Sequence, residues 1–122
     1  METRLSTRIL VELKVVSKIE ESAASKFSLA SGNVFEATAV DISETGISLS
    51  SKFFLPAQLV VQLNFDTGSF GIPGTLSIKG EVRHCENLKE SGYKVGIHFL
   101  DIPDTFRAAL SHYIASNEHR KV

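Results

Sequence analysis

The feature that most constrains this chain is a period-two alternation between apolar and polar residues that recurs along most of its length. Successive side chains on a β-strand point to opposite faces, so this alternation is typical of strands with one buried face. Six segments show it, most regularly the last three: residues 9–16, 35–42, 46–50, 59–65, 76–82 and 93–99. Turn-forming residues separate the later segments, which favours short antiparallel connections.

The C-terminal segment departs from this pattern. Its apolar residues fall at i, i+3, i+4, i+7 and i+8, the spacing of one helix face: Phe106, Ala109, Leu110, Tyr113 and Ile114. A proline followed by an aspartate, at positions 103 and 104, favours a helix start there. We therefore predict a mostly all-β fold, a six-stranded antiparallel β-barrel over residues 9–100 with a C-terminal α-helix over residues 103–117.

Length, charge and cysteine content exclude several classes of protein. A chain of 122 residues is long enough for one domain with its own core. The 13 basic and 14 acidic residues give a net charge of -1, which argues against a protein that coats DNA or an anionic membrane. The single cysteine, Cys85, suits a reducing compartment, and no apolar run approaches the about 18 residues of a membrane span. We expect a cytoplasmic protein with no DNA partner and no membrane span.

The histidines do not indicate a metal site. His84, His98, His112 and His119 show no metal-ligand spacing such as an i, i+4 pair. Cys85 follows His84 directly, and neighbours on a strand point to opposite faces, so the two cannot form a catalytic dyad. The sequence therefore predicts neither a bound metal nor a nucleophile with its base.

One segment leaves an enzymatic alternative open. Asp66-Thr67-Gly68-Ser69 follows an apolar strand and resembles the active-site turn of aspartic proteases. The chain carries one copy, so such a protease would have to be a homodimer that uses Asp66 from each subunit. An Asp-Thr-Gly sequence is also an ordinary turn, and the glycines that follow up to Gly74 favour a hairpin connection.

Two short motifs stand in order along the chain. Arg4 and Arg8 form R-x-x-x-R before the first predicted strand, and Asp41, Ser43 and Gly46 form D-x-S-x-x-G between two strands. The last predicted strand adds V-G-x-x-F, and a helix follows it. Together these features resemble the PilZ domain family, bacterial receptors for cyclic di-GMP, and the resemblance covers nearly the whole chain.

The resemblance implies that these five motif residues bind cyclic di-GMP, and their chemistry suits that ligand. Arginine forks bridge phosphate oxygens and stack on purine faces, the roles of Arg4 and Arg8. A carboxylate accepts both donors on the N1–N2 edge of guanine, which adenine lacks, so Asp41 would select guanine. The Ser43 hydroxyl would add a hydrogen bond, and Gly46 would allow a positive φ or close approach of the ligand.

Two further expectations concern the surroundings of these motifs. Arg83 should point outward from its strand and is a further candidate for the ligand site. Its alternative is an ordinary solvated strand face shared with Lys79 and Glu81. Residues 1–8 should form a flexible ligand-binding arm that becomes ordered as it wraps the ligand.

We therefore expect one domain, residues 1–122, that is a receptor rather than an enzyme and needs no further cofactor. Cyclic di-GMP would change its conformation and so signal to a downstream protein partner. The main alternative is a PilZ-fold interaction module that binds its partner without nucleotide, as family members without the arginine pair do. The pair present here favours nucleotide binding, unless both arginines are merely terminal charges and the D-x-S-x-x-G segment merely a turn.

Overall fold

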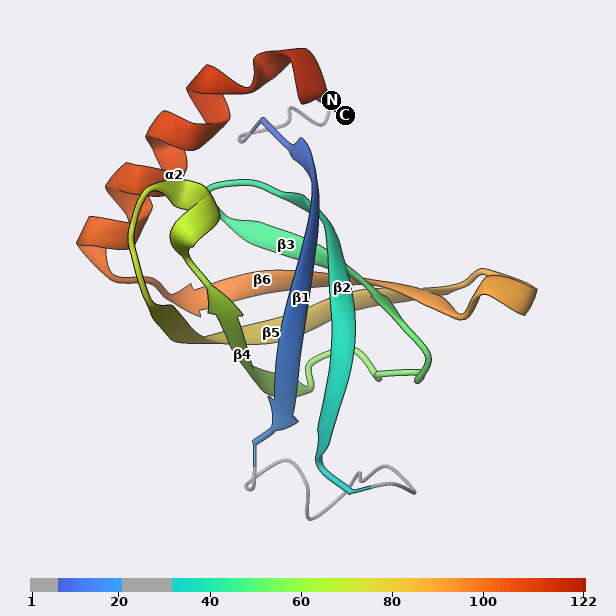
Figure 1. Ribbon diagram of the computed structural model, residues 1–122. Helices are drawn as coiled ribbons and strands as arrows, with labels where there is room; N and C mark the ends of the chain where they lie inside the picture. Colours follow the sequence, from blue (N-terminus) through green and yellow to red (C-terminus); the bar gives the residue numbers. More distant parts are fainter. Residues whose placement is uncertain (1–6, 21–31) are drawn as a thin grey trace.

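Six β-strands close into a barrel in which every neighbouring pair of strands is antiparallel (Figure 1). The computed structural model describes residues 7–20 and 32–122. The strands are β1 (Ile9–Ile19), β2 (Val34–Ile42), β3 (Gly46–Ser51), β4 (Val60–Asp66), β5 (Thr75–Asn87) and β6 (Tyr93–Asp101). Their order around the barrel is β1-β2-β3-β6-β5-β4, and the predicted six-stranded antiparallel barrel is confirmed.

The alternation in the sequence places the core inside the barrel. In β4 the inward residues are Val61, Leu63 and Phe65, which are buried, while the residues between them are partly exposed. Burial of each such side chain contributes about 1.5–3 kcal/mol relative to exposure. The barrel interior is therefore filled mainly with apolar side chains, and most polar residues of the strands lie on its outer face; Ser17 of β1 is a buried exception.

Strand β5 is longer than the alternation predicts. Its pairing with β6 is interrupted by irregularities between Lys79 and Gly80 and between Val82 and His84. Beyond Val82 its residues are mostly polar and exposed, so no alternation marks them as a strand. Pairing with β6 continues nevertheless as far as Asn87, and the β5–β6 hairpin extends beyond the body of the barrel (Figure 1).

One end of the barrel is covered by helix α2 (Asp104–Ser116), which confirms the predicted C-terminal helix. The short 3₁₀-helix η1 (Gly68–Phe70) lies in the β4–β5 connection and brings Phe70 against the helix. The Phe70 ring centroid lies 5.5 Å from that of Phe106 and 4.8 Å from that of Tyr113. The predicted hairpin connection thus also serves as part of the cap.

No helix in the described part of the chain is long and apolar enough to cross a membrane.

The C-terminal residues return to the start of β1. After the 3₁₀-helix η3 (Glu118–Arg120), Lys121 forms an isolated β-bridge with Ile9. The backbone N–H of Val122 donates a hydrogen bond of 2.9 Å to the carbonyl oxygen of Arg8. The backbone at Arg8 is therefore held by the C-terminal segment, which lies beside the beginning of β1 (Figure 1).

Replacing Phe106 with alanine should lower the free energy of unfolding by about 3–5 kcal/mol. Phe106 is 1% exposed and its ring packs against Phe65 and Phe70, so the variant leaves a cavity between helix and barrel. Urea denaturation measures the loss. Leu100→Ala, at a β6 residue that is 48% exposed, is the control and should change stability by less than about 0.5 kcal/mol. Equal stability of the two variants would show that the helix does not stabilise the barrel.

Candidate ligand-binding site

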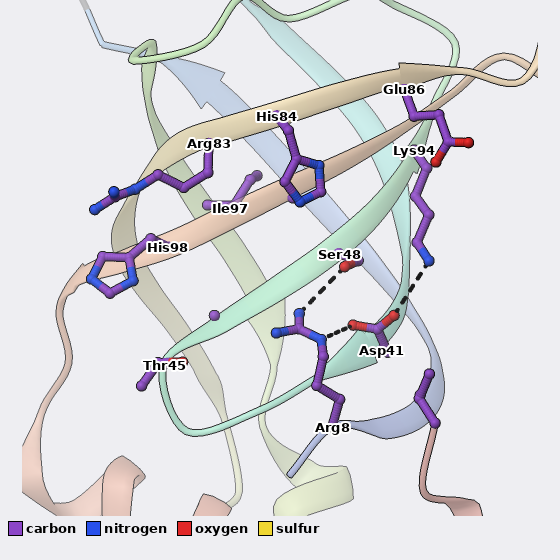
Figure 2. A pocket seen from close by; sticks show the side chains of 13 residues that line it. Arg8, Asp41, Thr45, Ser48, Arg83, His84, Glu86, Lys94, Ile97 and His98 are labelled. Atoms are coloured by element: carbon purple, nitrogen blue, oxygen red, sulfur yellow. Dashed lines mark hydrogen bonds and ion pairs between the residues drawn. The ribbon is translucent and has the colours of Figure 1, made fainter. Parts of the chain in front are cut away.

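A groove of about 580 Å³ lies on the outer face of the barrel, over β3, β5 and β6 (Figure 2). It is lined by Arg8, Asp41, Thr45, Gly46, Ser48, Arg83, His84, Glu86, Lys94, Gly96, Ile97, His98 and Val122. Its volume is in the usual range for small-molecule sites. Three cationic side chains, Arg8, Arg83 and Lys94, face two carboxylates, Asp41 and Glu86. The groove therefore suits an anionic ligand even though the chain as a whole is weakly acidic.

The pair formed by Arg8 and Asp41 is at one side of this groove. Arg8 Nε donates a hydrogen bond of 2.8 Å to Asp41 Oδ1, and Lys94 Nζ lies 3.8 Å from Asp41 Oδ2 (Figure 2). The Asp41 side chain is only 4% exposed. A buried carboxylate is costly unless it is paired and hydrogen-bonded, so Asp41 depends on these two cations.

Arg8 makes two further contacts through its terminal nitrogens. Nη1 lies 3.4 Å from the hydroxyl oxygen of Ser43, and Nη2 lies 3.3 Å from that of Ser48. With the bond to Asp41, these contacts use three of the five N–H groups of the guanidinium, as far as the described residues go. One N–H on each terminal nitrogen is left, and the Arg8 side chain is 24% exposed. Arg8 is thus held in place and can still donate to an anion.

Ser43 holds the turn between β2 and β3. Its backbone N–H donates to the carbonyl oxygen of Gly46 at 2.8 Å, and its hydroxyl oxygen accepts from the N–H groups of Thr45 and Gly46, both at 3.2 Å. Such side chain–backbone bonds are how serine stabilises turns. Ser43 is fully buried, so the structure gives it a role in the turn, and its contact with a ligand stays a prediction.

Gly46 is required by the packing of strands. A Cβ atom at Gly46 would collide with the backbone carbonyl oxygen of Ile97 on β6. The expectation of a positive φ at Gly46 is wrong, because its φ is not among the positive values in the chain. The sequence motif indicated correctly that no side chain fits here, but the backbone of β6 is what excludes it. Close approach of a ligand to Gly46 stays a prediction.

Two further arginines, Arg4 and Arg83, are candidates for the ligand site. Arg4 lies outside the described residues. Arg83 lines the groove, as expected for an outward-facing residue, and its Nε lies 3.3 Å from Glu81 Oε1. The Arg83 side chain is 55% exposed, so it can leave this weak surface pair at little cost. Arg83 remains a candidate.

Asp66 lies outside the groove and has the geometry of a turn residue. Its Oδ1 accepts a hydrogen bond of 2.7 Å from the N–H of Gly68, and the hydroxyl of Thr67 donates to the carbonyl oxygen of Ile72 at 2.7 Å. These bonds explain the Asp-Thr-Gly sequence as a turn in the β4–β5 connection. Within residues 7–20 and 32–122, no three His, Cys, Asp or Glu side chains lie together as a metal site would require.

Sequence reasoning missed the groove residues Ser48, His84 and Lys94. Ser48 reaches the site through strand register, because it pairs with Asp41 on one side and with Gly96 on the other. Lys94 does so as well, since it pairs with the groove residue Glu86. Alternation predicts that such residues face outward, but it does not say which outward residues become neighbours. For His84 one signal existed, since Gly96 in the last strand leaves room above it for a neighbouring side chain.

Known families and structures resemble the chain over most of its length. The family model for the PilZ domain matches residues 2–116. No curated protein sequence gives a significant match. The family match confirms the resemblance drawn from the motifs.

Three solved structures show how closely the fold is shared. The Bacillus subtilis inhibitor of motility (MotI/DgrA) has a TM-score of 0.71 at 15% identity, over 98% of this chain and 54% of that chain. The PilZ domain of Escherichia coli YcgR with c-di-GMP has a TM-score of 0.63 at 14% identity, over 97% of this chain and 93% of that chain. The MrkH–c-di-GMP complex from K. pneumonia has a TM-score of 0.63 at 16% identity, over 95% of this chain and 52% of that chain. The chain thus spans about half of two of these structures, and at such identities the likeness concerns the fold.

Arg8→Ala should lower the free energy of unfolding by about 1–3 kcal/mol, because it leaves the buried Asp41 without its hydrogen-bonded partner. Adding Asp41→Asn should restore part of the loss, since the uncompensated charge is then gone. Urea denaturation measures each step. Arg83→Ala is the matched control, because its pair is exposed and should contribute less than about 1 kcal/mol. If Arg8→Ala costs no more than Arg83→Ala, Asp41 does not depend on Arg8.

Proposed function

Since the chain belongs to the PilZ domain family, we propose that its groove binds cyclic di-GMP and that binding is signalled to a protein partner. The family is one of cyclic di-GMP binders, and its members are generally non-enzymatic receptors. The observation that carries the proposal is the arrangement of Arg8. It is held at the groove by the buried aspartate of the D-x-S-x-x-G motif, and among the described residues two of its N–H groups have no partner and can donate to an anion.

The cations of the groove suit the two phosphates of a cyclic dinucleotide. Arg8 offers one N–H on each terminal nitrogen, and each can donate to a phosphate oxygen. The side chains of Lys94 and Arg83 are 42% and 55% exposed and can turn their charges toward a second phosphate. Arg4, four residues before Arg8, would add a second guanidinium. The ligand would therefore be held mainly by charge-assisted hydrogen bonds on the outer face of the barrel.

Asp41 serves this site in two ways. Its first role is to orient Arg8 through the bond between Oδ1 and Nε. Its second oxygen lies 3.8 Å from Lys94 Nζ, which is longer than a hydrogen bond, so Oδ2 keeps the capacity to accept from a ligand. When Lys94 turns to a phosphate, this oxygen would be free for the N1 and N2 donors of guanine. The preference for guanine over adenine would follow from that contact.

The alternative is an interaction module that binds a protein without nucleotide. In its favour, Phe54 and Leu88 are exposed apolar residues, and the Phe54 ring packs edge-on against Tyr93 with centroids 5.9 Å apart. Exposed aromatic residues are common in protein interfaces. This surface lies near the β5–β6 hairpin and does not require the groove. A protein partner could bind this surface whether or not the groove binds a nucleotide. A measurement of nucleotide binding therefore decides between the two functions.

Titration calorimetry should show that the protein binds cyclic di-GMP and binds cyclic di-AMP more weakly. Arg8→Ala should reduce the affinity for cyclic di-GMP by about 10- to 150-fold, the loss of a charged hydrogen bond. Circular dichroism at the titration temperature verifies that this variant is folded. Asp66→Asn, outside the groove, is the control and should bind as the wild type does. Absence of binding by the wild type would favour the interaction module, and peptidase activity lost in Asp66→Asn would revive the protease alternative.

Amide hydrogen exchange should locate the conformational response. Cyclic di-GMP should protect residues 3–9 and 41–46, the two motif segments. Protection should extend to Val122, because its N–H is bonded to the carbonyl oxygen of Arg8. The buried face of α2, with Phe106 and Leu110, should change little. Protection confined to residues 109–116, with no change at the motif segments, would contradict the assignment of the site.

A further inference from the structure

The imidazole of His84 lies in the groove in an arrangement that the sequence motifs do not explain. A Cβ atom at Gly96 would collide with the His84 ring, with Cε1, Nε2 and Nδ1 as its nearest atoms. Contact with three consecutive ring atoms places the face of the imidazole, and not its edge, over the backbone at Gly96. Figure 2 shows the side chain reaching from β5 over the neighbouring strand β6.

The opposite face of this ring is open. His84 lines the groove and is exposed, although one side of its ring is packed on the strand below. An irregularity in β5 between Val82 and His84 lets both Arg83 and His84 line the groove, which regular alternation would forbid. The imidazole therefore forms a flat aromatic surface with backbone beneath it and the groove above it.

Strand register places this surface at a definite distance from the arginine. Asp41, Ser48, Gly96 and His84 are consecutive partners across four neighbouring strands, from β2 to β5. The guanidinium of Arg8 reaches Ser48, whose backbone is two strand spacings, roughly 10 Å, from that of His84, and the His84 ring extends back over the strand between them (Figure 2). One nucleotide can bridge such a span from its phosphate to its base.

We propose that His84 is the stacking platform for one guanine base of the ligand. The proposal rests on the proposed function, because it concerns where a base lies once Arg8 holds a phosphate. Stacking between a base and an aromatic side chain requires an exposed ring face held at a fixed angle, and Gly96 provides that support. Stacking does not distinguish bases strongly, so His84 would add affinity while Asp41 would supply the preference for guanine.

The chain contains no tryptophan, which allows a direct test. His84→Trp places the protein's single indole at the platform, where a stacked guanine should quench its fluorescence. On titration with cyclic di-GMP we expect its emission to fall by about half or more, with affinity at least that of the wild type. His84→Ala should bind about tenfold more weakly, and His84→Phe should stay within about threefold of the wild type.

His112→Trp is the matched control, because His112 is an exposed residue of α2 outside the groove. It should bind with wild-type affinity and show no quenching. If the wild type binds cyclic di-GMP but His84→Ala binds equally well and His84→Trp is not quenched, the stacking role is overturned and the receptor function stands. If the wild type does not bind in calorimetry, the proposed function itself fails, and the platform with it.

Discussion

The burial of Asp41 is the constraint on which the candidate site depends. A carboxylate that is 4% exposed requires a cation, and Arg8 provides it with a 2.8 Å bond while Lys94 stands at its other oxygen. Because Asp41 is on a barrel strand, the pair fixes Arg8 relative to the sheet. The C-terminal segment holds the backbone of the same arginine through Val122. One buried charge thus converts an arginine near the start of the chain into a fixed element of the groove.

Two glycines let the strands and side chains of the groove approach closely. Gly46 brings β3 against the backbone of β6, and Gly96 lets an imidazole lie flat over β6. Any larger residue at either position would have to displace its neighbour. The shape of the outward faces of β3, β5 and β6 therefore depends on the absence of a side chain at Gly46 and Gly96 as much as on the charged residues. The apolar interior of the barrel contributes one buried residue, Ile97, to the lining of the groove.

Much of the fold was predictable, because half-buried strands and an amphipathic helix leave periodic patterns in the sequence. The end of β5 was not, since its residues are polar and only pairing with β6 makes them a strand. At the candidate site, the motifs singled out Arg8 and Asp41 as candidates, but they did not predict that the two side chains bond to each other. Nor did they show why position 46 must be glycine, because the atom that excludes a side chain there belongs to Ile97 on another strand. Such relations arise from register, and register between distant segments is not encoded in local alternation.

The existing bond between Arg8 and Asp41 lowers the entropic cost of ordering Arg8 when a ligand binds. If Arg8 were on a free arm, binding would have to order its backbone and long side chain, at about 0.5–1.5 kcal/mol for such a side chain alone. Here folding has already ordered both, so its hydrogen bonds to a phosphate would appear almost undiminished in the affinity. Binding would instead redirect Arg83 from a weak surface pair and Lys94 from its 3.8 Å contact with Asp41, which would keep its 2.8 Å bond to Arg8. A change in those exposed charges at the groove, more than a movement of Arg8, is then what a protein partner would detect.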